Sequence, residues 1–210
     1  MPRPVNADAA ATKQRILDSA LDLFGQRGID GVSLRELAAD AQVSSAMIHH
    51  CFGGKDGLRQ AAIDTMYSKL QTQSVEMMMM LAAGQSPNAG DVFDKAVASS
   101  FQFVRAHRSA VRWLLRDVVG RGSLDSQRVA STYAPFMNAV TARLSELTGV
   151  EATLLRMPLH SSITLVARYG VSDESEMLRL TGVDDLEVAV DLIQEELRRS
   201  VRQLMRLPAN

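Results

Sequence analysis

Residues 33–58, SLRELAADAQVSSAMIHHCFGGKDGL, decide the fold of this chain. Ser33 and Glu36 form an S-x-x-E capping box, in which the hydroxyl accepts from a free backbone N–H and the carboxylate reaches back to the Ser33 N–H. An apolar stripe at helical spacing follows, and Ser44 can cap a second short helix over residues 45–51. Two short helices joined by a tight turn predict a helix-turn-helix, whose second helix enters the major groove of DNA.

The second helix of this motif divides into an inner and an outer face. Its spacing directs Ile48 inward together with Phe52, and leaves an outer face that can meet DNA. The base readers that we expect on this outer face are Ser45, Ala46 and Met47. Their side chains are short or apolar, so Arg35 and the shape of the DNA are expected to carry part of the specificity.

Phosphate contacts are expected on either side of these readers. Lys55 follows two glycines, which let backbone amides approach a phosphate closely, although a plain flexible turn also explains the glycines. His49 and His50 are predicted phosphate neighbours, so DNA affinity should rise as acid protonates them. The motif is not a Walker loop, because the first glycine and the Ser/Thr after the lysine are missing.

Residues 12–63 resemble the DNA-binding domain of the TetR-type (tetracycline-repressor-like) regulators. The matching segments are TKQRIL at 12–17, ALDLF at 20–24, RG at 27–28, GVSLRELA at 31–38, VS at 43–44, His50, Phe52, Lys55 and Leu58. The resemblance implies an all-α homodimeric repressor with a ligand-sensing second domain. It also implies that Ser33 and Ser44 help to hold the phosphate backbone. Family members often have a cation at position 45, Tyr at 49 and Pro-Ser before the lysine. Here Ser45, His49 and Gly53-Gly54 predict a weaker phosphate grip.

Composition restricts the class of protein further. The 210 residues are 46% hydrophobic and 22% charged, which is ordinary for a folded domain, and the net charge is −1. The first 60 residues hold seven basic and seven acidic side chains, so attraction to DNA must come from the placement of charge. One cysteine, no signal peptide and no apolar run of membrane length predict a cytoplasmic protein.

The chain is expected to divide into a flexible arm (1–11), the helix-turn-helix domain (12–58) and a ligand-binding and dimerisation domain (59–210). Arg3 of the arm could reach DNA, although an untethered terminus is the simpler interpretation. A long helix over 56–83 should bridge the two domains, with a loop at 84–90 behind it. We expect a helix over 124–148 to kink at Pro135, and a helix over 151–170 to be broken early by Pro158.

The resemblance places an effector pocket in the second domain, and sensor pockets are typically apolar with a few placed polar groups. The candidate lining residues are Met66, Tyr67, Leu70, Phe101, His107, Trp113, Arg116, Tyr133, Phe136 and Met137. The run Met77–Met80 covers every side of a helix, and pocket lining and plain core packing explain it equally well.

The last two long helices carry apolar stripes at 4, 3, 4 spacing, and the resemblance implies that these helices form a four-helix dimer interface with their copies, with packing inside a single chain as the weaker alternative. The predicted interface residues are Leu159, Ile163, Val166, Gly170, Val190, Ile193, Leu197 and Val201.

No catalytic or metal constellation is expected in this chain. G-x-S-x-G, C-x-x-C, H-E-x-x-H and G-x-G-x-x-G are all absent, which argues against an enzyme. Neighbours in the His49-His50-Cys51 run point about 100° apart on a helix and cannot easily share an ion. We therefore expect no cofactor and no metal, with Cys51 as a redox switch left as a minor alternative. The main rival function is a helical dimeric interaction module that does not bind DNA.

Overall fold

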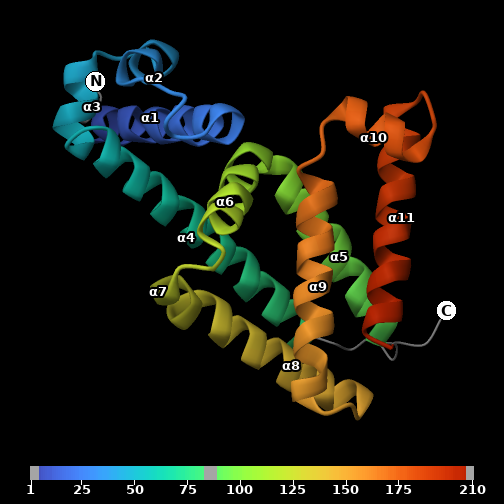
Figure 1. Ribbon diagram of the computed structural model, residues 1–210. Coiled ribbons are helices and arrows are strands. Elements are labelled where there is room, and N and C mark those ends of the chain that lie inside the picture. The colour runs from blue at the N-terminus through green and yellow to red at the C-terminus, as the bar shows by residue number, and fades with distance from the viewer. Residues whose placement is uncertain (1–4, 83–88, 207–210) are drawn as a thin grey trace. The chain divides into compact units, whose positions relative to one another are not determined.

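A computed structural model describes residues 5–82 and 89–206, and within these ranges every regular element is a helix (Figure 1). The predicted all-α fold is therefore confirmed. Arg3, and most of the loop predicted at 84–90, lie outside the described residues. The elements are α1 (Val5–Arg27), α2 (Leu34–Asp40), α3 (Ser45–Phe52), α4 (Lys55–Ala82), α5 (Ala89–Ala106), α6 (Arg108–Arg121), α7 (Ser126–Arg128), a π-helical turn η1 (Val129–Tyr133), α8 (Ala134–Thr148), α9 (Ala152–Gly170), α10 (Glu174–Thr181) and α11 (Leu186–Leu204).

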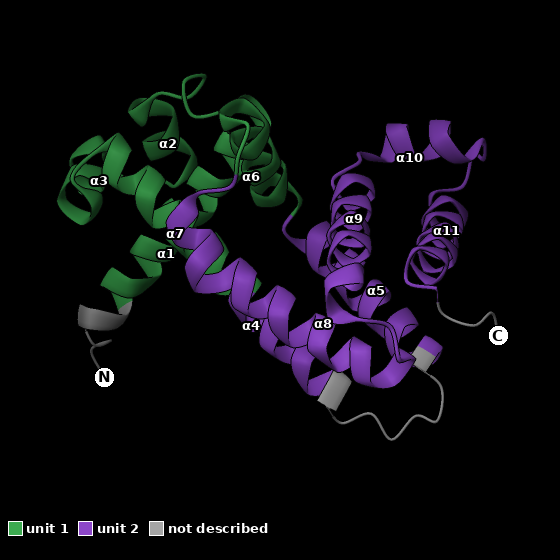
Figure 2. Ribbon diagram, turned by 60° about the horizontal axis from the view of Figure 1, so that its bottom comes forward, with its two compact units in different colours: residues 1–70, 108–123 green, residues 71–107, 124–210 purple. Residues whose placement is uncertain are grey.

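The chain forms two compact units, shown in different colours in Figure 2. The first unit joins residues 1–70 to residues 108–123, so it contains α1, α2, α3, the first part of α4, and α6. The second unit holds residues 71–107 and 124–210. The segment 12–58 therefore lies wholly within the first unit, and α6 is added to it from far along the chain.

Helix α1 begins earlier than the sequence analysis expects. Residues 5–11 form its first turns, where a flexible arm is predicted, and the helix continues to Arg27. The segment ADAAAT at 7–12 explains this, because alanine has the highest helix propensity and Asp8 lies near the positive end of the helix dipole. Gly28 ends the helix with a φ of +74°, the left-handed conformation that glycine adopts easily just past a helix C-terminus.

Close contact between α1 and α6 organises the first unit. A Cβ atom on Gly25 would lie 2.2 Å from the carbonyl oxygen of Ser109, so only glycine lets the two backbones approach this closely. The rings of Phe24 and Trp113 pack beside this point with centroids 5.3 Å apart, and both side chains are buried. Trp113 is thus a core residue of the first unit.

In the second unit, α9 packs against α5, α8 and α11, and α11 also packs against α5. Gly170 lies against Val104 of α5, where a Cβ atom would approach the valine methyl group to 2.5 Å. Arg202 of α11 makes two hydrogen bonds to Asp94 of α5, at 2.8 and 2.7 Å, with only 12% of its side chain exposed. This half-buried ion pair fastens α11 to α5.

The prediction that Pro158 breaks its helix is wrong. Pro158 lies inside α9 without breaking it. The proline cannot donate to the carbonyl of Leu154, and Leu154 is a 63% exposed residue near the start of the helix. Within the helix predicted over 124–148, residues 126–148 are helical without a break and include a π-helical turn just before Pro135. Because Pro135 has no N–H for the carbonyl four residues earlier, the chain passes through the π-helical turn before α8 begins at Ala134.

Candidate nucleic-acid interface

The capping box at the start of α2 has the predicted hydrogen bonds. The Glu36 N–H donates to the Ser33 hydroxyl at 3.2 Å, and the Ser33 N–H donates to the Glu36 carboxylate at 2.7 Å. Arg27 of α1 reaches the same carboxylate at 2.8 Å, which ties α1 to the start of α2. The backbone N–H of Ser33, then its side chain, then Arg27 lower the pKa of the Glu36 carboxyl from 4.5 to about 2.

The turn between α2 and α3 depends on a left-handed residue. Gln42 has a φ of +55°, a conformation that glycine adopts easily and that other residues adopt at a cost. The Val43 N–H then returns to the Ala38 carbonyl at 2.9 Å and closes the turn. Val43 itself is half-buried. Together with this hydrogen bond, its packing holds the turn that leads into α3.

Helix α3 is capped at both ends, which sets the direction of its outer side chains. The Ser44 hydroxyl accepts from the Met47 N–H at 3.1 Å, as predicted for an N-cap. At the other end Gly53 has a φ of +75°, and its N–H donates to the His49 carbonyl at 2.9 Å. Ile48 is completely buried beneath the helix.

The predicted DNA contacts are placed on the surface of the first unit. Seven of them are exposed: Ser33, Arg35, Ser44, Ala46, Met47, His49 and His50. Ser45 and Lys55 are half-buried. The structure therefore places eight of the nine residues in the helix-turn-helix and Lys55 at the start of α4, with the side chains of α3 largely open. Lys13 of α1 lies 5.8 Å from the centre of the Phe52 ring, so a further cation stands next to the end of α3.

The predicted effector residues divide between the two units. Met66, Tyr67, Leu70, Trp113 and Arg116 belong to the first, and Phe101, His107, Tyr133, Phe136 and Met137 to the second. Arg116 has a structural task, because it donates to the carbonyl oxygens of Gly25 and Gln26 at 3.0 and 3.2 Å. The sequence reasoning missed this role, since no local pattern connects residues so far apart in the chain.

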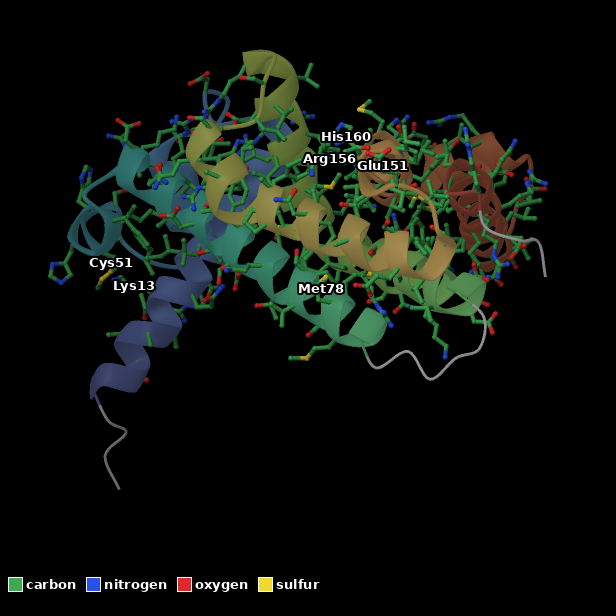
Figure 3. The ribbon with its side chains drawn as sticks, turned by 90° about the horizontal axis from the view of Figure 1, so that it is seen from below. Lys13, Cys51, Met78, Glu151, Arg156 and His160 are labelled. Carbon is green, nitrogen blue, oxygen red and sulfur yellow. The ribbon has the colours of Figure 1, made fainter. Side chains whose placement is uncertain are left out.

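Within the second unit, the effector candidates differ in exposure. Phe101 and Met137 are only 1% and 2% exposed, whereas Phe136 and His107 are half-buried. The hydroxyl of Tyr133, at the end of the π-helical turn, lies 2.6 Å from Nδ1 of His160. Figure 3 shows His160 on α9 next to Arg156, whose guanidinium donates to the Asn138 side chain of α8 at 2.5 Å. Burial raises the pKa of Tyr133, which keeps the phenol protonated.

Most of the predicted dimer residues are already buried within the single chain. Six of them, Leu159, Val166, Gly170, Ile193, Leu197 and Val201, are buried in the core of the second unit. Ile163 is 36% exposed and Val190 is half-buried. Apart from Ile163, the exposed apolar side chains of the same two helices are different ones: Leu154 and Met157 on α9, and Val188 and Leu192 on α11.

Comparison with known proteins supports the helix-turn-helix. The model of the family "Bacterial regulatory proteins, tetR family" matches residues 16–62. The chain is 30% identical over 141 residues to the HTH-type transcriptional regulator BetI of Brucella anthropi, a match that covers 66% of this chain and 70% of that protein. It is 30% identical over 134 residues to the probable HTH-type transcriptional regulator YttP of Bacillus subtilis, where 59% of this chain matches 58% of the relative, less than two thirds of its length.

Solved structures share the fold along almost the whole chain. A TetR-like transcriptional regulator from Rhodococcus sp. RHA1 covers 97% of this chain and 98% of its own, with a TM-score of 0.59 and 22% identity. The match to a TetR-family transcriptional regulator from Streptomyces coelicolor covers 94% of this chain and 95% of that protein, with a TM-score of 0.63 and 19% sequence identity.

A helix-turn-helix on an all-helical body defines a class of DNA-binding proteins. Within that class, the chain belongs to the TetR family of bacterial transcriptional regulators. A member of this family is a regulator rather than an enzyme. Among the described residues, none of the helices is both long enough and apolar enough to span a bilayer.

Proposed function

We propose that this chain is a ligand-responsive transcriptional regulator, and that it acts as a dimeric repressor released from a palindromic operator by a small, largely apolar molecule. The observation that carries the proposal is α3, an eight-residue helix capped at both ends, whose outer side chains are open. Two such helices in a dimer would enter successive major grooves, about 34 Å apart.

In this proposal the outer face of α3 reads bases while its surroundings hold phosphates. Ser45, Ala46 and Met47 occupy the first turn of α3, the part of a recognition helix that meets base edges. Arg35 on α2 and Lys55 at the start of α4 supply charge to the flanking phosphates. Ser33, Ser44, His49 and His50 complete the phosphate contacts.

We propose a revised dimer face on the exposed apolar residues of α9 and α11. Leu154 and Met157 are 63% and 69% exposed on α9, and Val188 and Leu192 are each 46% exposed on α11. The two helices pack against each other in the second unit, so these residues belong to neighbouring elements. Leu154 and Met157 lie near the start of α9, and Val188 and Leu192 lie near the start of α11. A two-fold axis that buried either pair against a second copy would remove its apolar surface from water.

The effector is proposed to act in the second unit, on α5 and α8. Phe101 and Met137 supply apolar surface there, while Phe136 and His107 are half-buried and can change their contacts. Trp113 and Arg116 are withdrawn from the effector contacts, because they hold α6 against α1. Met77, Met78 and Met80 are half-buried and Met79 is 64% exposed, so this run stays a secondary candidate.

Two continuous connections can transmit the effect of the ligand. Helix α4 has residues 55–70 in the first unit and its remainder in the second. Helix α6 belongs to the first unit, while α5, which directly precedes it, belongs to the second. A ligand that binds more tightly when these helices are displaced would lower DNA affinity, and DNA would weaken ligand binding by the same factor.

The testing experiment is fluorescence anisotropy of the protein with the DNA immediately upstream of its own gene, at several salt concentrations. Tight binding with a steep negative salt slope, which persists in excess unrelated DNA, is expected. If neither this DNA nor any sequence recovered from a random-sequence selection binds specifically, the interaction module without DNA binding becomes the better function.

A further inference from the structure

Polar side chains of α8, α9 and the π-helical turn meet in one cluster of the second unit. The hydroxyl of Tyr133, the last residue of that turn, lies 2.6 Å from Nδ1 of His160, and the two rings pack edge to face with centroids 6.0 Å apart. Arg156, one turn before His160 on α9, donates to the Asn138 side chain of α8 at 2.5 Å. Because π-helical turns are rare and frequently lie at functional sites, the cluster is a candidate binding site.

The cluster keeps hydrogen-bond donors that no protein group uses. Since burial raises the pKa of the Tyr133 hydroxyl, the phenol stays protonated and donates to Nδ1 of a neutral His160. The proton of that imidazole then lies on Nε2, and in the described part of the chain no acceptor bonds to it. Arg156 uses one nitrogen for Asn138, and its other donors have no acceptor among the same residues. His160 is exposed and Arg156 is half-buried, so these donors are open to a ligand.

No carboxylate of the described residues forms an ion pair with Arg156. Glu151, which Figure 3 shows on the same helix, accepts instead from the Thr153 hydroxyl at 2.6 Å. The charge of Arg156 nevertheless acts within the cluster, because it opposes the rise in the pKa of Tyr133. A half-buried guanidinium without a carboxylate partner favours an anionic ligand.

The donors and their surroundings select the class of anion. A guanidinium offers parallel N–H groups that match the two oxygens of a carboxylate, and its single charge balances one carboxylate, whereas a phosphate carries about 1.5 to 2 charges at pH 7. Apolar surface lies one helical turn beyond the cluster on each side. Ile163 follows His160 on α9 and is 36% exposed, and Phe136 follows Tyr133 on α8 and is half-buried.

We propose that Arg156 and His160 bind the carboxylate of a small organic acid, whose apolar part lies on Ile163 and Phe136. Arg156 pairs with the negative charge, and Nε2 of His160 donates a hydrogen bond. Tyr133 is a positioning residue, because its hydroxyl holds the imidazole with Nε2 free. Phe136 also belongs to the proposed effector region, so the acid would act as the effector. This regulatory role rests on the proposed function, whereas binding of the acid does not.

The test compares octanoate with octanamide by isothermal titration calorimetry of the full-length protein without DNA. The two probes share an apolar chain and differ in charge, so wild type should bind octanoate about tenfold more tightly. Arg156→Met should bind both probes equally. Tyr133→Phe should lower the affinity for octanoate severalfold and leave that for octanamide unchanged. Arg143→Met removes a half-buried arginine that pairs with Glu146 on α8, and this control should keep the wild-type preference.

Equal binding of the two probes by wild type, or no binding of octanoate at millimolar concentration, would overturn the proposal. Inorganic phosphate that binds with the same dependence on Arg156 and displaces octanoate would also overturn it, in favour of a phosphate ligand. Circular dichroism and analytical ultracentrifugation verify that each variant keeps its helices and its oligomeric state. With an operator in hand, octanoate should release wild type from DNA and leave Arg156→Met bound. Binding of octanoate without release would establish the carboxylate site and remove its regulatory role.

Discussion

Nη1 of Arg116 lies 3.0 Å from the carbonyl oxygen of Gly25, although 91 residues separate them in the chain. The guanidinium satisfies carbonyls in the last turn of α1, which have no partner within their own helix. Asp117, the next residue of α6, meets Arg121 at 3.0 Å and Arg59 of α4 at 3.9 Å. Helix α6 thus fastens both α1 and the first part of α4.

Gly25→Ala tests the close approach of α1 and α6. The added methyl group would lie 2.2 Å from the Ser109 carbonyl oxygen, which is part of the backbone and cannot rotate away. We expect a loss of about 1–3 kcal/mol in the free energy of unfolding, measured by urea denaturation. Gly120→Ala is the matched control, because a Cβ there meets nothing within 4 Å. It should stabilise α6 by up to about 1 kcal/mol. Equal effects of the two substitutions would contradict the close contact.

Glu36→Gln tests the capping box through pH. The folded pKa of about 2 lies below the ordinary value of 4.5, so ionised Glu36 stabilises the folded state above pH 4.5. This contribution is lost as the pH falls from 4.5 toward 2. In urea denaturation, wild type should exceed Glu36→Gln in stability at pH 7, and the gap should narrow toward pH 3. Glu76→Gln, at an exposed position of α4 outside any capping box, is the matched control for the substitution itself. A Glu36 gap independent of pH would contradict the cause assigned to the shift.

Gln42→Gly tests the strain in the turn before α3. The φ of +55° suits glycine, so the substitution should stabilise the protein by roughly 0.5–1 kcal/mol despite the greater freedom of the unfolded chain. Gln71→Gly, at an exposed position inside α4, should instead cost about 1 kcal/mol. Thermal or urea denaturation of the two variants measures both changes in stability. A loss of stability in both variants would show that Gln42 is not strained.

Arg35→Ala and Lys55→Ala test the proposed phosphate contacts. Each should weaken binding to specific and unrelated DNA alike, and each should reduce the slope of log K against log salt by about 1, because one fewer counterion is released. Lys95→Ala removes an exposed cation from α5 in the second unit and should change neither quantity. A salt slope that stays the same in both test variants would remove these residues from the interface.

Met157→Glu tests the proposed dimer face on α9. Met157 is 69% exposed in the single chain, so a charge should be tolerated by the folded protomer and should prevent its burial against a second copy. Analytical ultracentrifugation should show a dimer for wild type and a monomer for the variant, with an unchanged circular dichroism spectrum. Val119→Glu, at an 81% exposed position of α6, should stay dimeric. A dimeric Met157→Glu would place the interface elsewhere.

The features that the sequence predicts well have their causes within a few residues. The partners of the capping box are three positions apart, and the Ser44 hydroxyl reaches a backbone N–H at the same separation. The helix-turn-helix was therefore predictable before any tertiary contact was known. The placement of α6 was not, because Trp113 is an apolar residue that could pack against many partners, and only the folded chain selects Phe24.

The stripes of the last helices show a different limit of sequence reasoning. A 4, 3, 4 spacing indicates that Ile193 and Leu197 share an apolar face, but it does not say what covers that face. In the folded chain both are buried, and Leu192 beside them is the exposed residue. Pro158 was similarly unpredictable, since its cost depends on whether the carbonyl of Leu154 can reach water.

The composition of the first unit from two separate segments has a consequence for synthesis and for engineering. On the ribosome, residues 1–70 emerge well before residues 108–123. The first unit therefore cannot complete its packing until α5 and α6 have been translated. A chimera with its crossover near residue 70 would leave Phe24 without Trp113, and a grafted effector domain would bring a foreign helix to Gly25. A chimera that is meant to keep the first unit intact should therefore include residues 108–123 together with residues 1–70. The DNA-binding part of this regulator is thus encoded in two separate segments of the chain.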